Sequence, residues 1–176
     1  MQLIYVSSHY QIPTFMREIE LSTKVWVCQY EDLSSCDRIL VDAARKATTR
    51  SYAPYSGFSV GAAVRLSNGE IVTGNNQENA AYPSGLCAER TTLFWASAQY
   101  PDAAMETLAI AARNANGELS VPISPCGACR QVMLEMEKRH NKPMRIILYG
   151  TKEIYIIEDG VKTLLPITFD ADFLEI

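Results

Sequence analysis

The sequence predicts an α/β fold with three layers, α-β-α, built around a mixed five-stranded sheet. Three observations support this prediction. Asn68-Gly69 separates two β-rich stretches, and this dipeptide accepts the positive φ angles of a tight hairpin turn. Later segments alternate between strand and helix patterns, which is typical of a sheet with helices on its faces. The chain has 176 residues, 48% of them apolar, which suits one domain with a sizeable core.

The N-terminal part of the chain differs from the rest. Residues 1–32 contain no catalytic motif, although residues 23–30 have the β-branched and aromatic content of a strand. We therefore expect residues 1–32 to form an extension packed on or beside the core. Residues 33–176 are expected to form the main domain.

The first helix is predicted to begin at Ser34 or Ser35, since either serine can cap it. Apolar residues at spacings of three and four form its expected buried side, namely Leu33, Cys36, Leu40, Ala43, Ala44 and Ala47. The helix should end near residues 51–57, where proline and glycine indicate a loop. We expect Cys28 and Cys36 to be core thiols, because free cysteine is often buried.

The remaining elements follow from turn signals and from the period of the apolar residues. The predicted strands are residues 58–66, 70–74, 108–112, 144–149 and 154–157, the first two pairing antiparallel. A polar loop, residues 75–86, precedes a helix over residues 87–100, and a second helix covers residues 128–139. Both helices should begin at one end of the sheet, where open α/β sheets bind their ligands.

Two short motifs stand at the starts of these helices, Cys87-Ala88-Glu89 and Pro125-Cys126-Gly127-Ala128-Cys129. A helix N-terminus carries about half a positive charge, so cysteines there ionise readily and become good zinc ligands. Three protein ligands leave the fourth tetrahedral position open, as in catalytic zinc sites. Such a zinc lowers the pKa of a bound water. The motifs therefore indicate a catalytic zinc site.

Two other interpretations of the cysteines are weaker. A closed structural zinc site needs a fourth ligand, and the candidates Cys28, Cys36, His9 and His140 have no partner at close ligand spacing. A redox Cys-x-x-Cys motif would involve Cys126 and Cys129 alone and leave the first motif unexplained.

Charged residues next to the cysteines suggest further roles. Glu89 could simply complement the helix dipole, but a carboxylate two positions after a zinc ligand can also carry protons to and from the reacting groups. Three thiolates on a divalent ion leave a net charge of −1. A nearby guanidinium would offset this excess, and both Arg90 and Arg130 are close enough in sequence.

Four separated segments, in this order, resemble the small homotetrameric cytidine deaminases, a family of zinc-dependent nucleoside deaminases. The segments are Ala53-Pro54-Tyr55-Ser56-Gly57-Phe58-Ser59-Val60-Gly61-Ala62-Ala63, Glu78-Asn79-Ala80-Ala81-Tyr82, Cys87-Ala88-Glu89-Arg90 and Pro125-Cys126-Gly127-Ala128-Cys129-Arg130-Gln131. The resemblance covers residues 36–169 and implies a cytidine deaminase-like fold in a catalytic domain of residues 33–176. The family usually has a Gly-Leu-Thr-Ile-like stretch where this chain has Pro83-Ser84-Gly85-Leu86.

The resemblance also implies roles for individual residues. Cys87, Cys126 and Cys129 would hold one Zn²⁺ per subunit, and Glu89 would be the catalytic proton shuttle. The predicted substrate-binding residues are Asn76 and Glu78 at the ribose hydroxyls, Phe58 beside the pyrimidine and the Ala88 backbone near the base. Arg90 would compensate charge at the zinc. For Phe58 the alternative is a core aromatic residue.

The implied activity is hydrolytic deamination of cytidine and deoxycytidine to uridine and deoxyuridine, with release of ammonia, in pyrimidine salvage. The implied assembly is a homotetramer, in which Phe169 would reach a neighbouring site or else close on its own subunit. Rival functions are another deaminase of the superfamily, acting on a nucleoside antibiotic, a deoxynucleotide or an RNA base, and a zinc-stabilised interaction module without activity.

Charge and hydropathy restrict the partners. A net charge of −4 and a pI near 5.2 argue against a nucleic-acid-binding surface. No apolar run approaches the roughly 18 residues that span a bilayer. Met1 to Tyr5 lacks the basic start of a signal peptide. We therefore expect a cytoplasmic protein with a small nucleoside substrate and neither a membrane nor a nucleic-acid partner.

Overall fold

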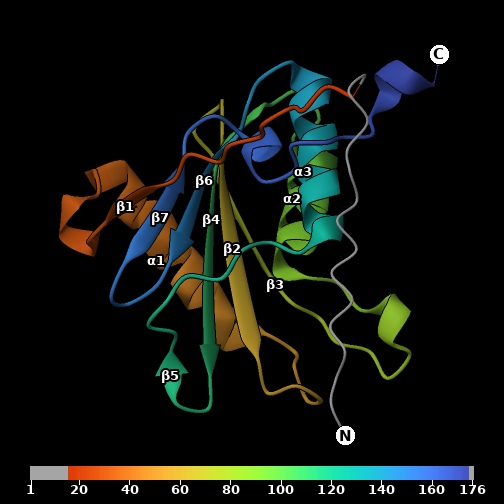
Figure 1. Cartoon of the computed structure of the whole chain (residues 1–176). Helices are drawn as coiled ribbons and strands as arrows, with labels where there is room; N and C mark the ends of the chain where they lie inside the picture. The colour runs from red at the N-terminus through yellow and green to blue at the C-terminus, as the bar shows by residue number, and fades with distance from the viewer. Residues whose placement is uncertain (1–15, 175–176) are drawn as a thin grey trace, which may run out of the picture.

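The computed structural model describes residues 16–174, which form an α/β fold in three layers (Figure 1). The segment Met1 to Tyr5 and half of the predicted extension lie outside the described residues. The strands are β1 (Trp26–Cys28), β2 (Ser59–Leu66), β3 (Ile71–Asn75), β4 (Met105–Asn114), β5 (Gly117–Glu118), β6 (Arg145–Tyr149) and β7 (Ile154–Ile157). The α-helices are α1 (Ser35–Ala47), α2 (Ala88–Gln99) and α3 (Gly127–His140). Helix α1 covers one face of the sheet, whereas α2 and α3 cover the other.

The sheet has the order β1-β7-β6-β4-β2-β3, with β5 paired to the end of β4. The β4–β6 pair is parallel and the other pairs are antiparallel, so the predicted mixed sheet is confirmed. The five predicted strands correspond to β2, β3, β4, β6 and β7, which are consecutive neighbours in the sheet. Two short strands join them, and one of these, β1, comes from the N-terminal extension.

Helix α1 confirms the predicted cap and corrects the predicted buried side. The Asp37 backbone N–H donates to Ser34 Oγ at 3.1 Å. The prediction that Cys36 is a core thiol is wrong, because its side chain is exposed, and Cys28 is only partly buried. The physical reason is that Asp37 takes the buried position beside it and pairs with Arg145 Nη1 of β6 at 2.8 Å.

Close contact between backbones positions α2 on the sheet. A Cβ atom at Gly74 in β3 would lie 2.6 Å from Thr92 Oγ1 and 2.8 Å from the Thr92 nitrogen of α2. Only glycine permits this approach. The contact fixes α2 and therefore the place of Cys87, the residue directly before the helix.

The segment from β5 to α3 is held along its course by the loop after β6. Backbone N–H groups of Thr151 and Lys152 donate to the carbonyls of Leu119 and Ser120 at 2.9 and 3.0 Å. A Cβ atom at Gly150 would lie 2.7 Å from the Ser120 oxygen, so a side chain does not fit there. These contacts set the path that leads to Cys126.

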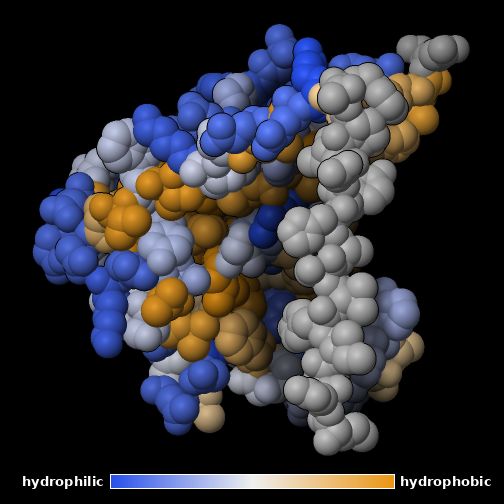
Figure 2. Space-filling model, in the orientation of Figure 1, coloured by the Kyte–Doolittle hydropathy of each residue, from blue (hydrophilic) through white to orange (hydrophobic). Residues whose placement is uncertain are grey.

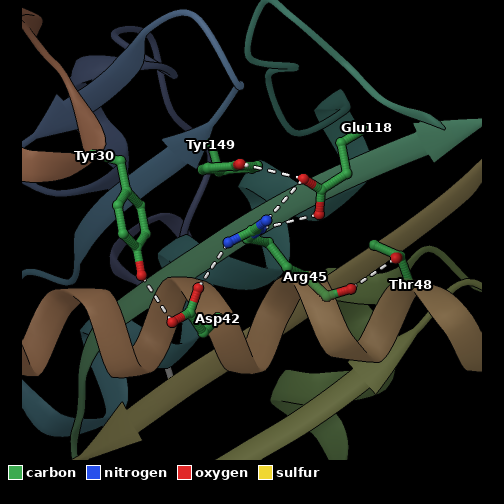
Figure 3. Close-up of polar contacts among 6 residues, drawn as sticks. All are labelled: Tyr30, Asp42, Arg45, Thr48, Glu118 and Tyr149. Atoms are coloured by element: carbon green, nitrogen blue, oxygen red, sulfur yellow. Dashed lines mark hydrogen bonds and ion pairs between the residues drawn. The ribbon is translucent and has the colours of Figure 1, made fainter.

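A polar network ties the start of this segment to α1 (Figure 3). Arg45 donates from Nε and Nη2 to the two carboxylate oxygens of Glu118, both at 2.9 Å, and from Nη1 to Asp42 at 2.9 Å. The Tyr149 hydroxyl contacts Glu118 at 3.3 Å, and the Tyr30 hydroxyl donates to Asp42 at 2.8 Å. The network thus joins Tyr30, α1, β5 and β6 across one face of the sheet.

The surface in Figure 2 shows apolar residues gathered over the strands left of α3, with polar residues around them. The exposed side chains of β1 include Trp26 and Val27. Within residues 16–174, every helix is too short or too polar to cross a bilayer.

The Arg45–Glu118 pair predicts a pH-dependent contribution to stability. Arg45 lowers the pKa of Glu118 below its ordinary value of 4.5. Stabilisation is therefore present above pH 4.5 and is lost as the pH falls through the lowered pKa. We expect Glu118→Gln to lower the free energy of unfolding by about 1–2 kcal/mol near pH 7, and by less in acid.

Urea unfolding of the unmodified chain and of Glu118→Gln, from pH 7 into the acid range, measures the difference in their free energies of unfolding. Glu135→Gln is the matched control, because Glu135 forms an exposed pair with Arg139 at 3.7 Å and should change stability by less than about 0.5 kcal/mol. A Glu118→Gln difference that is constant with pH would contradict the prediction.

Candidate metal centre and active site

Three thiols meet where α2 and α3 begin. Cys87 and Cys126 are the residues directly before the two helices, and Cys129 lies in the first turn of α3. Cys126 Sγ lies 3.8 Å from Cys87 Sγ and 3.5 Å from Cys129 Sγ, and all three atoms lie within 4.8 Å of one another. Zn–S bonds of about 2.3 Å in a tetrahedron separate two sulfurs by about 3.8 Å. The residues present therefore fit a zinc ion.

The thiols influence one another's protonation. Hydrogen bonds from the Cys129 thiol, and then from Arg90, lower the pKa of Cys87 to about 5. The bond to Cys87, together with burial, raises the pKa of Cys129 above its ordinary value. The helix N-termini also favour thiolate at both motifs. One thiol of the group is thus ready to act as an anionic metal ligand.

Glu89 lies in the first turn of α2 and is only 5% exposed. Burial raises the pKa of its carboxyl above the ordinary value, and the charge of Cys87 adds to this effect. A hydrogen bond with Cys129 and the charge of Arg90 act in the opposite direction. A carboxyl group with this environment, beside the thiol cluster, is suited to exchange protons.

The two arginines near the motifs behave differently. Arg90 Nη2 lies 3.9 Å from Cys87 Sγ, and the Arg90 Nε atom is buried without a hydrogen-bond partner among the described residues. The Arg130 guanidinium instead donates to the carbonyls of Pro125 and Leu164 and to Ser124. Charge compensation at the thiols is therefore available from Arg90, whereas Arg130 is engaged with oxygen atoms.

A cavity of about 410 Å³ opens beside Cys87 and Arg90. Its lining comes from the loop before β2, the loop before α2 and the start of α2: Tyr55, Ser56, Asn76, Gln77, Glu78, Asn79, Tyr82, Gly85, Leu86, Cys87 and Arg90. Its size lies within the range of small-molecule sites. Two predicted substrate-binding residues, Asn76 and Glu78, thus share a cavity with a predicted zinc ligand.

Asn76 and Glu78 are held in place by the loop before β2 and by the start of β2. Asn76 Oδ1 accepts from the Val60 nitrogen at 2.8 Å, and Asn76 Nδ2 donates to the Phe58 carbonyl at 2.9 Å. The Glu78 carboxylate accepts from the Tyr55 nitrogen at 2.9 Å and from Ser56 Oγ at 2.5 Å. These bonds lower the pKa of Glu78, so it is an anionic acceptor at neutral pH.

Three other predicted site residues, Phe58, Ala88 and Phe169, are not part of the cavity lining. Phe58 is partly buried directly before β2 and is outside the cavity lining, as is Ala88, the fully buried first residue of α2. Phe169 is 60% exposed and stacks on Phe173, while its carbonyl accepts from Gln131 Nε2 at 2.8 Å.

Sequence reasoning missed seven of the eleven cavity residues, among them Tyr55, Ser56 and Tyr82. Ser56 bonds Glu78, and the rings of Tyr55 and Tyr82 meet edge to face with centroids 6.2 Å apart. Tyr55 and Ser56 belong to the first segment on which the family resemblance rests, and Tyr82 ends the second. Their presence in those segments was the available signal.

Comparison with known proteins agrees with this geometry. The family model for the "cytidine and deoxycytidylate deaminase zinc-binding region" matches residues 34–142. The cytidine deaminases of Halalkalibacterium halodurans and Sporosarcina psychrophila are 38% and 39% identical over 135 residues, which is 77% of this chain and 95% and 92% of theirs. The crystal structure of cytidine deaminase from Burkholderia pseudomallei is 36% identical, with a TM-score of 0.64 over 74% of this chain and 97% of that one.

The fold and the thiol site define a zinc-binding deaminase domain. The chain belongs to the cytidine and deoxycytidylate deaminase family. The predicted fold class and the predicted zinc cofactor are thereby confirmed.

The site predicts one zinc ion per chain, lost when Cys126 is replaced. Cys126→Ser should weaken zinc binding by more than about 100-fold, because it removes a ligand, whereas loss of an outer partner costs 10–100-fold. Zinc content after dialysis against a chelator measures this effect. Cys36→Ser is the matched control, since Cys36 is exposed on α1 and should leave one zinc per chain. A stoichiometric zinc in Cys126→Ser would contradict the assignment.

Proposed function

We propose that this protein catalyses the hydrolytic deamination of cytidine and deoxycytidine to uridine and deoxyuridine, with release of ammonia, as in pyrimidine salvage. The main support is the meeting of three thiols and the buried Glu89 at two helix starts, next to a cavity of nucleoside size. Relatives that align over most of this chain are named cytidine deaminases.

In the proposed site, Cys87, Cys126 and Cys129 hold the zinc. When bound, the ion supplies Lewis acidity and makes a water molecule more acidic. Arg90 compensates the negative charge of the thiolates, because its guanidinium approaches Cys87 Sγ. The N-termini of α2 and α3 add positive potential at the same place.

Glu89 is proposed as the proton carrier. It accepts a proton from the attacking water as oxygen adds to C4 of the base, and it delivers that proton to ring N3. The hydroxyl proton of the adduct then passes through Glu89 to the amino group, so that the C–N bond breaks, ammonia leaves and a carbonyl remains. One carboxyl group thus acts first as base and then as acid.

The cavity residues are proposed to recognise the nucleoside. Glu78 is an anionic acceptor, and Asn76 Nδ2 keeps one N–H donor beyond its bond to the Phe58 carbonyl, so together they offer an acceptor and a donor to a ribose diol. Phe58 would pack beside the pyrimidine, and the Ala88 backbone would contact the base, since the first N–H groups of a helix have no partner in the helix.

We further propose a homotetramer, with residues 1–32 as an extension and residues 33–176 as the catalytic domain. Phe94 and Trp95 on α2 are exposed, as expected for residues covered by other subunits. Exposure of Phe169 supports its proposed contact with a neighbouring site. The described cysteines are unpaired, which suits the reducing cytoplasm. A fully active monomer would contradict the shared site.

Ammonia release from cytidine, deoxycytidine, cytosine and CMP tests the proposal directly. Activity on the two nucleosides, with little on the free base or the nucleotide, is the expected result. A preference for CMP would favour the rival deoxynucleotide deaminase. Inactivity of the zinc-loaded protein on all four compounds would favour a zinc-stabilised interaction module.

Glu89→Gln should abolish nearly all turnover while the zinc content stays at one per chain. The amide keeps the shape of Glu89 but cannot accept and return a proton, and such proton transfer contributes about 10²–10⁴-fold. Steady-state ammonia release and metal analysis on the same sample measure both properties. Substantial activity in the metal-replete variant would rule out this role of Glu89.

Glu78→Ala should lower kcat/KM for cytidine by about 10–100-fold, because hydrogen bonds to a charged group contribute about 1.5–3 kcal/mol. The weak activity on cytosine, which has no ribose, should change much less. Ser56→Ala removes only the hydroxyl that bonds Glu78 and should have a smaller effect than Glu78→Ala. Equal losses on cytidine and cytosine would argue against ribose recognition.

A further inference from the structure

We propose that Arg130 is a positioning residue that couples Cys126 to the C-terminal segment, defined as residues 161–172. In this view the rate at which the chain releases zinc depends on the hydrogen bonds by which Arg130 joins that segment to the residues directly before Cys126. The inference rests on zinc binding by the three thiols, as proposed above, but not on the identity of the substrate.

The three guanidinium nitrogens of Arg130 reach three different acceptors. Nε donates to the Pro125 carbonyl at 2.8 Å, Nη2 donates to Ser124 Oγ at 2.9 Å and Nη1 donates to the Leu164 carbonyl at 2.6 Å. The planar fork of arginine presents donors in several fixed directions at once, which lysine does not. Arg130 therefore joins the segment at Ser124 and Pro125 to the segment at Leu164, which lies 34 residues after Arg130 in sequence.

The first of these segments carries a metal ligand. Ser124 and Pro125 directly precede Cys126, and the Arg130 backbone N–H donates to the Cys126 carbonyl at 3.0 Å. Cys129 is fully buried and held by packing, whereas Cys126 is exposed. Packing therefore constrains Cys126 less than Cys129, and the hydrogen bonds of Ser124 and Pro125 help to set the backbone from which Cys126 Sγ extends.

The second segment is anchored to α3 one heptad further along the helix. Glu137 is seven residues after Arg130, so both lie on one side of α3. Glu137 Oε1 accepts from the Val161 nitrogen at 2.8 Å, and the Val161 carbonyl accepts from the Leu164 nitrogen at 2.8 Å. The acceptor that Arg130 uses on Leu164 is consequently fixed by the same helix.

Two other residues of α3, Gln131 and Lys138, hold the rest of the C-terminal segment. Gln131 donates to the Phe169 carbonyl at 2.8 Å, and Lys138 pairs with Asp170 at 3.4 Å and with Asp172. Among these contacts, those of Arg130 alone extend to Ser124 and Pro125. Gln131→Ala is therefore a matched control, because it loosens the C-terminal segment but leaves the hydrogen bonds to Ser124 and Pro125 in place.

Charge and geometry make different predictions for Arg130. If the residue served mainly as a positive charge near the thiolates, lysine would replace it. If it serves through the three-way fork, lysine fails, because a single ammonium group cannot reach all three acceptors in the same way. The observed acceptors are oxygen atoms of the chain, which favours the fork.

Zinc release tests the proposal without substrate. The zinc-loaded full chain is mixed with an excess of a chromophoric chelator, and the release rate is followed by absorbance. Arg130→Lys and Arg130→Ala should both release zinc about 10–100-fold faster than the unmodified chain, the range seen when an outer partner of a metal ligand is lost. Gln131→Ala and Arg139→Lys, an exposed arginine of the same helix, should stay within about twofold.

The outcomes separate the alternatives. If Arg130→Lys releases zinc at the rate of the unmodified chain, Arg130 acts through its charge and not through its three-way hydrogen bonding. If Arg130→Ala also releases zinc at that rate, Arg130 has no role in holding the metal. Acceleration by Gln131→Ala equal to that by Arg130→Ala would mean that segment loosening alone acts. Because cytidine is absent, inactivity as a deaminase does not affect this test.

A second variant keeps the test valid if Arg130→Ala fails to fold. Ser124→Ala removes one of the three acceptors and should speed release by an intermediate factor. If both act through one connection, the double variant Ser124→Ala/Arg130→Lys should be no faster than Arg130→Lys alone. Fully multiplicative effects, or an unchanged rate in Ser124→Ala, would contradict the proposal.

Discussion

The interaction on which the site depends is the approach of three sulfur atoms to within bonding range of one small cation. Sulfurs at 3.5 and 3.8 Å cannot all be charged without strong repulsion, and the opposite pKa changes of Cys87 and Cys129 express this. A divalent ion removes the conflict, because cysteine binds a metal as the thiolate and the positive charge of the ion offsets the repulsion between the sulfurs. The fold must hold these atoms together, and much of its architecture serves that requirement.

The topology of the sheet meets this requirement in a simple way. Helix α2 connects β3 to β4, and α3 connects β4 to its parallel neighbour β6. Both helices lie on the same face and contact each other in one apolar core. Their N-termini therefore fall at the same end of the sheet, where positive potential from two helices supports anionic ligands and the cavity beside them.

Local sequence signals were sufficient for much of this description. Turn residues and apolar periods located the five main strands and three helices, and the spacing of the cysteines indicated the zinc site. What they could not show were contacts between distant segments. The predicted burial of Cys36 was wrong because Asp37 is buried instead and forms an ion pair with Arg145 of β6. The place of β1 in the sheet depends on its pairing with β7, which is distant in sequence. Position in the sequence made both Arg90 and Arg130 candidates for charge compensation, and the family resemblance favoured Arg90; among the described residues Arg90 contacts a sulfur, whereas Arg130 binds oxygen atoms.

The pairing of β1 with β7 has a consequence for how the chain is made. Trp26 lies opposite Ile156, so the earliest described strand pairs with the last one. A ribosome releases β1 long before its partner exists, and pairings of such large sequence separation form slowly. The centre of the sheet, from β2 to β6, can assemble first from segments closer in sequence. The first strand among the described residues thus depends on the last one for its place in the sheet.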